Sequence, residues 1–370
     1  MKLFKARIIL FIGICISIPN IINAQEVTIK LNPAKVYLIK SNHQQLLSSD
    51  FYFESTREDS LFLIRIEVKL LDKNNMLLMQ KDISRNGVSP GILTIPDRML
   101  RKEKILCVFN PFHTFDPDIP VTTFEFKFTF IDNDGKNSVD KIIKIVPSNI
   151  LSKTEHNLPF QNELILIKDG NDYYSHHRRV DLASAEQFNV TRHGNRYAYD
   201  FCPVNDKGEL FKNSEELLEN WFGFGKDVYA TADGTVVETY NETIDSKVGE
   251  IDFSYRDAAS NHKLIYGNYI IIDHHNGEFS GYMHLKKGSV KYQTGDKVKQ
   301  GEIIGQLGNS GDSFIPHLHY QLSNATTLLN SDGIPIYFSN YERVVGKNQI
   351  HVKKGYINTG EFIRAKNLKK

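Results

Sequence analysis

Strict alternation between apolar and polar residues is the feature that most constrains how this chain folds. Residues 61–71 read LFLIRIEVKLL and residues 121–131 read VTTFEFKFTFI, and within each stretch apolar residues recur at every second position. Successive side chains of a β-strand point to opposite faces, so this period is typical of strands with one buried side. The alternation therefore predicts a mostly-β chain.

The length of 370 residues exceeds what one hydrophobic core commonly supports, so we expect two domains. Turn signals such as Asn86-Gly87 and Asp134-Gly135 separate short strands in the first half, a spacing that favours an immunoglobulin-like β-sandwich over residues 25–148. A polar stretch near residues 147–159 marks the boundary. Residues 149–345 are predicted to form a second β-rich domain, and residues 346–370 a C-terminal extension.

Residues 1–24 have the layout of a signal peptide. Three basic residues precede an apolar run over residues 8–18, and a small residue, Ala24, offers a cleavage site. The run is too short to span a hydrocarbon core of ~30 Å as a helix. We therefore expect export to the periplasm or the extracellular space, with no transmembrane helix after signal removal. A lipoprotein anchor is not expected, because the residue before Cys15 is the large Ile14.

Charge and cysteine content exclude other classes of protein. With 45 Lys and Arg against 44 Asp and Glu, the net charge of +1 provides no electrostatic footprint for nucleic acid, and no such partner is expected. Three cysteines cannot build a disulfide framework. Whether Cys107 and Cys202 pair, and whether the protein forms oligomers, stays open at this level.

Three short segments of the second half carry side chains suited to chemistry. His317 and His319 are two apart on a predicted strand and should share a face. Asp200 ends an aromatic strand, and His284 lies in the apolar segment GYMHL, where we expect it to share a face with Tyr282. Each residue alone has an ordinary structural explanation, and the interest lies in their combination.

These segments occur in an order and spacing that resemble the lysostaphin-type (LytM-like) zinc metalloendopeptidases, the cell-wall peptidases. The resemblance covers roughly residues 160–340. It rests on YAYDF, YATADGTVV, GNYIIIDH, GYMHL, TGDKVKQGEIIGQLGNSG and PHLHY. It implies a lysostaphin-type antiparallel β-sheet with a groove that holds one Zn²⁺ per chain.

Carried over by position, the resemblance implies metal ligands at Asp200 and His319 and catalytic histidines at His284 and His317. The first histidine ligand is less direct, because the simplest family form places it four residues before the aspartate, where this chain has Arg196.

Three histidines upstream of Asp200 are candidates for that first ligand. We favour His177, because the segment SHHRR resembles relatives in which an upstream loop ending in HRR supplies it. His176 and His193 are the alternatives.

Three protein ligands leave one zinc position open for water, which is typical of a catalytic site. The resemblance therefore implies a zinc metalloendopeptidase that hydrolyses peptide bonds in peptidoglycan stem or cross-bridge peptides. The alternative is a weak or inactive member that binds the cell wall and activates another hydrolase. The N-terminal sandwich is expected to position the enzyme or cover its groove. His274 and His275 are expected to flank an exposed turn, and Arg178 and Arg179 to form structural ion pairs.

Overall fold

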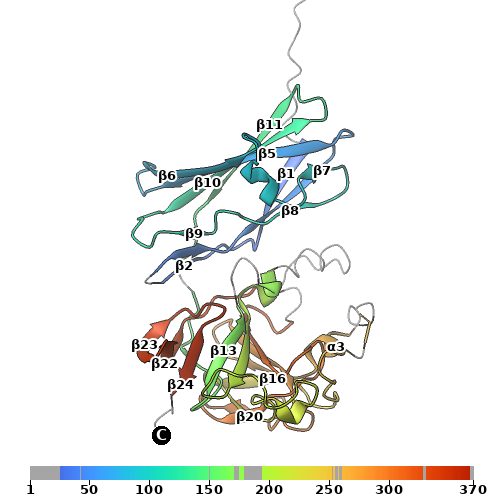
Figure 1. Cartoon of the computed structure of the whole chain (residues 1–370), viewed down its shortest axis with the longest axis vertical. Helices are drawn as coiled ribbons and strands as arrows, with labels where there is room; N and C mark the ends of the chain where they lie inside the picture. Colours follow the sequence, from blue (N-terminus) through green and yellow to red (C-terminus); the bar gives the residue numbers. More distant parts are fainter. Residues whose placement is uncertain are drawn as a thin grey trace, which may run out of the picture.

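The computed structural model describes residues 26–41, 43–149, 151–170, 175–178, 194–251, 253–254, 257, 261–327 and 331–366. It is mostly β, as predicted, and Figure 1 shows two lobes stacked along the long axis. We call residues 26–149 the N-terminal lobe and residues 151–366 the C-terminal lobe. The predicted signal peptide, residues 1–24, lies outside the described residues. Among the residues that are described, no helix is both long and apolar enough to cross a membrane.

Two larger sheets of the N-terminal lobe pack around one core. The smaller has the order β1-β4-β8, and the larger has the order β11-β10-β5-β6, with β7 beside β5. Their strands are β1 (Val27–Asn32), β4 (Asp50–Ser55), β5 (Leu61–Leu71), β6 (Leu77–Ser84), β7 (Met99–Leu100), β8 (Leu106–Val108), β10 (Thr123–Asp132) and β11 (Ser138–Ile145). A short 3-10 helix, η2 (Gly91–Thr94), lies between β6 and β7.

The alternating phenylalanines of β10 bind the two sheets together. The side chains of Phe126 and Phe128 are fully buried, and their ring centroids lie 4.8 and 4.7 Å from that of Phe51 on β4. Aromatic pairs in such tilted geometry contribute about 0.5–1.5 kcal/mol beyond their buried area. The period-2 pattern thus predicts both the strand and its buried face.

A small sheet, formed by β2 (Leu38–Lys40), β3 (Gln45–Leu47) and β9 (Thr114–Phe115), lies between the lobes in Figure 1. Its strands bury side chains on both faces. Ile39 and Leu46 belong to the core of the C-terminal lobe, whereas Leu38 and Leu47 belong to the core of the N-terminal lobe. The hairpin is therefore shared by two cores, and the lobes are joined by packing as well as by a linker.

The C-terminal lobe is built around one large sheet. Within the described residues it is 11-stranded, with the order β12-β22-β24-β13-β14-β21-β18-β17-β16-β19 and with β23 beside β22. Its strands are β12 (His156–Asn157), β13 (Leu164–Asp169), β14 (Tyr199–Val204), β16 (Gly234–Tyr240), β17 (Asn268–Asp273), β18 (Phe279–Leu285), β19 (Lys297–Val298), β21 (Leu318–Ser323), β22 (Phe338–Val345), β23 (Asn348–Gly355) and β24 (Phe362–Ala365). A separate pair is formed by β15 (Asp227–Tyr229) and β20 (Ile303–Gln306). Short helices are η3 (Gly194–Tyr197), η4 (Leu218–Asn220) and α3 (His262–Tyr266).

The residues after 345 take part in this sheet. β24 lies between β22 and β13, and Ile363 is fully buried in the core of the lobe. The segment that we expected as a C-terminal extension therefore contributes an internal strand. Cys202, on β14, is a buried free thiol, so no disulfide joins it to Cys107.

Candidate metal centre

Asp200 and His319 lie on adjacent strands near the middle of the large sheet. β14 and β21 are antiparallel, and Asp200 is the direct register partner of His319. Their chain neighbours Tyr199, Phe201 and Leu318 belong to the hydrophobic core, so alternation turns the carboxylate and the imidazole to the other face. His319 Nδ1 lies 3.3 Å from Asp200 Oδ1. A carboxylate and an imidazole far apart in sequence thus meet across one strand pair.

His177 reaches the same carboxylate oxygen from a different element. It lies in one helical turn, residues 176–178, where its amide donates to Ser175 Oγ at 3.1 Å. Its side chain is fully buried, and Nε2 lies 3.3 Å from Asp200 Oδ1. Both ring nitrogens of His177 and Oδ1 of Asp200 are buried without a hydrogen-bond partner in the described structure. The alternative ligand His193 lies outside the described residues.

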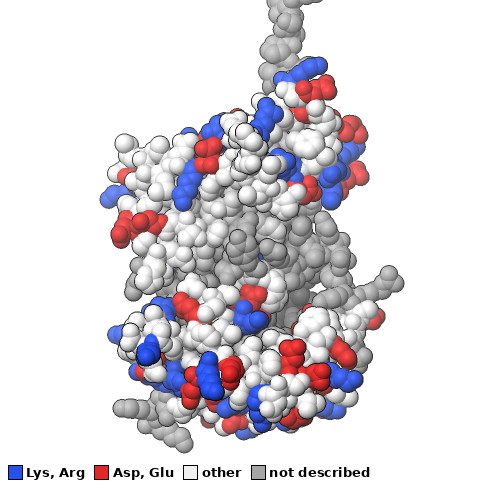
Figure 2. Space-filling view, in the orientation of Figure 1, with Lys and Arg blue, Asp and Glu red and all other residues white. Residues whose placement is uncertain are grey.

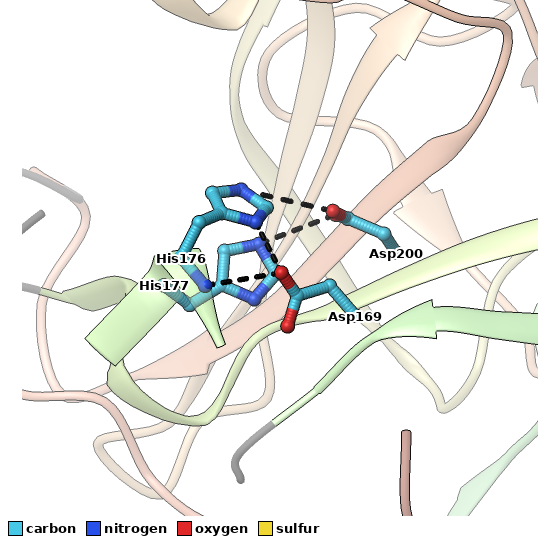
Figure 3. Close-up of side chains that lie close together, drawn as sticks. All are labelled: Asp169, His176, His177 and Asp200. Carbon is cyan, nitrogen blue, oxygen red and sulfur yellow. Dashed lines mark hydrogen bonds and ion pairs between the residues drawn. The ribbon is translucent and has the colours of Figure 1, made fainter. Parts of the chain in front are cut away.

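His176, the other alternative, has a partner of its own. Figure 3 shows its ring between Asp169 and Asp200. Asp169 Oδ2 accepts a hydrogen bond from His176 Nδ1 and another from its amide at 3.1 Å. His176 Nε2 is 3.8 Å from Asp200 Oδ2. Ligand atoms of Asp169, His176, His177 and Asp200 all lie within 4.8 Å of one another, so either histidine is near enough to contribute to a metal site.

Protonation distinguishes the two neighbouring histidines. Burial lowers the pKa of His177 despite the nearby Asp200. At His176 burial acts in the same direction, but the hydrogen bond that its ring donates to Asp169 and the charge of Asp200 outweigh it and raise the pKa. Because a metal ligand must be a neutral imidazole, this contrast favours His177.

His284 and His317 lie beside these groups. His317 Nε2 is 3.5 Å from Asp200 Oδ1. The ring centroid of His284 is 4.8 Å from that of His317 and 5.8 Å from that of His319. The structure therefore brings together His177, Asp200, His284, His317 and His319.

The expectation that His284 shares a face with Tyr282 was wrong. Tyr282 packs in the core against Tyr320, on the opposite face of the sheet from His319. His284 has a φ of 62°, in the left-handed region that non-glycine residues rarely adopt. This single residue interrupts the alternation of β18 and turns the imidazole toward the histidines on the site face. Such backbone strain is a common feature of functional positions.

The backbone and one glutamine orient the rings. His284 Nδ1 contacts the carbonyl of Ser310 at 2.8 Å, and His317 Nδ1 contacts the carbonyl of Ile315 at 2.8 Å. Because carbonyls only accept, each Nδ1 carries a proton, so in the neutral ring the lone pair is on Nε2. His319 is the reverse, because its Nε2 donates to Gln321 Oε1 at 3.0 Å and leaves Nδ1 free toward Asp200.

Sequence reasoning missed Gln321 and Asp169. Gln321 is two residues beyond His319 on the same strand, so the period of 2 places both side chains on one face and could have identified it. Asp169 is the register partner of Asp200, next to a bulge in β13, and pairing between strands is not visible in the sequence.

The donor set fits a zinc ion. Burial would raise the pKa of Asp200, but the surrounding His177, His317 and His319 outweigh it and hold the pKa well below its usual range. The carboxylate is therefore ionised, and the imidazole nitrogens around it become metal ligands once they give up their protons. Two histidine nitrogens and one carboxylate oxygen are ligands that zinc commonly takes at catalytic sites.

Two other expectations have clear outcomes. His274 is buried rather than exposed, because Nδ1 contacts the carbonyl of Asp233 at 2.7 Å and Nε2 contacts Ser280 Oγ at 2.9 Å. His275 is exposed as expected. Arg178 forms a buried ion pair with Asp50, as predicted, and Arg179 lies outside the described residues.

A protein-family model matches the part of the chain that carries three of the candidate site residues. Residues 222–331 match the model of Peptidase family M23. This segment is a Peptidase family M23 domain. The matched M23 segment contains His284, His317 and His319, and it begins after His177 and Asp200.

Relatives of the chain include two proteins of Vibrio cholerae. The chain is 45% identical over 62 residues to the peptidoglycan DD-endopeptidase ShyC, covering 17% of this chain and 14% of that protein. It is 37% identical over 98 residues to the peptidoglycan DD-endopeptidase ShyA, covering 26% of this chain and 17% of that protein. The chain thus matches less than a fifth of either relative's length. Among solved structures, the catalytic domain of lysostaphin from Staphylococcus simulans is 25% identical, with a TM-score of 0.22, over 37% of this chain and 74% of that one.

Proposed function

We propose that this chain is an exported zinc metalloendopeptidase that hydrolyses peptide bonds in the stem or cross-bridge peptides of peptidoglycan. The observation that carries the proposal is the convergence of His177 Nε2 and His319 Nδ1, each 3.3 Å from Asp200 Oδ1, with His284 and His317 beside them. The names of the M23 relatives support peptidoglycan as the substrate class.

In this proposal His177, Asp200 and His319 hold one Zn²⁺. A zinc ion held by these residues would supply a water ligand with a pKa of about 7 and would polarise the scissile carbonyl. Gln321 fixes the tautomer of His319, and such partners of metal ligands raise ligand basicity. The chain itself supplies a negative carboxylate and two neutral imidazoles, so the site carries one net positive charge when loaded.

His284 and His317 supply the proton chemistry. Both present an Nε2 lone pair, because a backbone carbonyl holds the proton on each Nδ1. Burial, together with the neighbouring His317 and His319, keeps the pKa of His284 well below its usual range, so the ring is neutral at pH 7. One of the pair accepts a proton from the attacking water at Nε2 and later donates the same proton to the leaving amine. The other, in its protonated form, donates a hydrogen bond to the developing oxyanion.

The inactive-activator alternative loses its main support. It gains weight if none of the three upstream histidines reaches the metal. Arg196 stands four residues before Asp200, and the imidazole of His177 lies beside the carboxylate instead. A complete set of candidate ligands favours an enzyme.

Digestion of purified peptidoglycan by the full chain, with product masses, tests the proposal. We expect about one Zn²⁺ per molecule and products cleaved in the peptide moiety, and we expect a chelator to abolish both. His275→Ala is the matched control, since it removes an exposed imidazole and should change neither. Zinc-free protein that still cleaves, or zinc-loaded protein that cleaves no peptide bond in peptidoglycan, would refute the proposal.

A further inference from the structure

The N-terminal lobe places one buried carboxylate against the metal-site end of the C-terminal lobe. Asp50, the first residue of β4, is 1% exposed. Arg178 binds both of its oxygens, Nη2 to Oδ1 at 2.5 Å and Nε to Oδ2 at 3.1 Å. Arg196 Nη2 donates to Oδ2 at 2.7 Å, and the amide of Asn110 donates to Oδ1 at 2.8 Å. Asp50 is therefore a four-fold acceptor that ties two arginines together.

The electrostatics of this contact are strongly favourable to the ionised form. Burial opposes ionisation of Asp50, but the guanidinium groups of Arg178 and Arg196 outweigh it and lower its pKa to about 2. A bidentate arginine–carboxylate contact also fixes the orientation of both groups, which a lysine could not do. The contact thus specifies geometry as well as charge.

Both arginines are adjacent to the candidate metal ligands. Arg178 directly follows His177 in the turn of residues 176–178. Arg196 is in η3, which leads into β14 and Asp200. Holding these two guanidinium groups on one carboxylate therefore holds the two chain segments that carry His177 and Asp200.

Further contacts between the lobes surround this ion-pair cluster. Arg196 Nε donates to Ser48 Oγ at 3.1 Å, and the hydroxyl of Tyr197 donates to the carbonyl of Ser48 at 3.4 Å. The guanidinium carbon of Arg178 lies 5.6 Å from the centroid of Phe109. The interface is a buried, directional contact and not a loose approach of two surfaces.

We propose that Asp50 is a positioning residue for the metal centre, through which the N-terminal lobe fixes His177 and raises the affinity of the C-terminal lobe for its metal. The inference rests on the proposed zinc site. It assigns the N-terminal lobe a role in building that site, beyond covering or targeting it. Partners that orient metal ligands typically change metal affinity 10–100-fold.

Metal titration of full-length variants tests this role. Asp50→Asn keeps the shape of the side chain and removes the charge, and we expect its Kd for Zn²⁺, measured by competition with a chromophoric chelator, to rise 10–100-fold. The visible spectrum of the Co²⁺-loaded protein should change with it, because His177 is no longer held. Hydrolysis should recover at saturating zinc, which a general loss of folding would not allow. Asp50→Glu restores the charge and should recover part of the affinity.

Arg57→Gln is the matched control. Arg57 pairs with Glu26 and Asp59 beyond the far end of β4, and the five residue steps from Asp50 to Ser55 alone span ~17 Å. This variant should lower the thermal midpoint without changing the Kd for metal. If Asp50→Asn fails to fold, Arg178→Lys is used in its place. This substitution keeps the positive charge at position 178 and removes only the bidentate contact with Asp50. We expect that variant to bind zinc more weakly.

Each outcome decides between the two proposals. Wild-type affinity in Asp50→Asn, or in Arg178→Lys where that variant is used, overturns the positioning role and leaves the proposed function intact. An equal rise in Kd in Arg57→Gln also overturns it, since the effect would then be general destabilisation. A wild-type chain that binds no zinc overturns the proposed function itself.

Discussion

Two groups of buried histidines lie on opposite faces of β21. His319 faces His177 and Asp200, whereas His156 contacts the hydroxyl of Tyr320 from the core face and packs edge-on against His274 at 5.2 Å. All of these rings are at most 9% exposed. Burial therefore does not distinguish them.

Their partners do distinguish them. His156 Nδ1 contacts Thr231 Oγ1 at 3.0 Å, and His274 contacts a carbonyl and a serine hydroxyl. In the described structure, no carboxylate lies within ion-pair distance of either ring. In the site group, imidazole nitrogens converge on one ionised carboxylate, with Nδ1 of His319 and Nε2 of His177 left for a metal. The comparison teaches that convergent lone pairs around a charge, rather than buried imidazoles, define the candidate site.

The largest expected effect separates the two groups directly. His319→Ala removes a proposed ligand, so we expect loss of bound zinc and of hydrolysis by at least 10³-fold. His274→Ala removes an equally buried ring and should lower stability while zinc content stays near one per chain. Elemental analysis and peptidoglycan digestion measure both variants. Retained cleavage in His319→Ala, or zinc loss in His274→Ala, would show that the two groups of histidines do not differ in metal binding.

A smaller effect sharpens the ligand set. His177→Ala should weaken zinc binding by at least 100-fold, because its buried Nε2 faces Asp200. His176→Ala, one residue away, should weaken it by less than about tenfold, because that ring is already bound to Asp169. Zinc titration of the pair measures the difference. The reverse order would make His176 the ligand.

The next effect concerns the hydrogen bond between Gln321 and the proposed ligand His319. Gln321→Leu removes the acceptor of His319 Nε2–H at similar volume, so we expect zinc affinity to fall 10–100-fold. Ser280→Ala, which removes the hydroxyl beside His274, is the corresponding change in the other group and should leave the affinity unchanged. Equal affinities in the two variants would show that Gln321 does not orient the ligand.

The smallest effect is in the stability of the core group. Burial, with repulsion from His274, holds the pKa of His156 well below its unfolded value of 6.5. Below pH 6.5 the imidazole of His156 is protonated in the unfolded chain but stays neutral in the folded chain. The free energy of unfolding therefore falls as pH falls, by up to about 1.4 kcal/mol per pH unit. We measure the free energy of unfolding of zinc-free protein in urea at several pH values from 6.5 to about 5. This free energy should change less steeply with pH in His156→Gln than in the wild type. Equal slopes would mean that His156 does not resist protonation.

Much of the fold could be predicted from local pattern. Residues 61–71 form β5 over the expected span, and residues 121–131 form β10 (Thr123–Asp132) with its ends shifted by one or two residues, because period 2 and turn residues are read from neighbours in sequence. His284 could not be placed this way, since one left-handed residue reverses the face on which its ring lies. His274 was misplaced for a related reason. An Asn-Gly turn predicts exposure, but two polar groups from other segments enclose the ring.

The sequence alone determined that the chain is mostly β, that residues 222–331 carry the M23 motifs, and which histidines and aspartate are candidates, because these depend on residue type and on short spacings. Only the tertiary structure decided that Asp200 faces His319, that His177 reaches the same oxygen, and that Asp50 binds both flanking arginines. Strand register and contacts between lobes depend on packing over more than a hundred residues of sequence, and no local pattern carries that information.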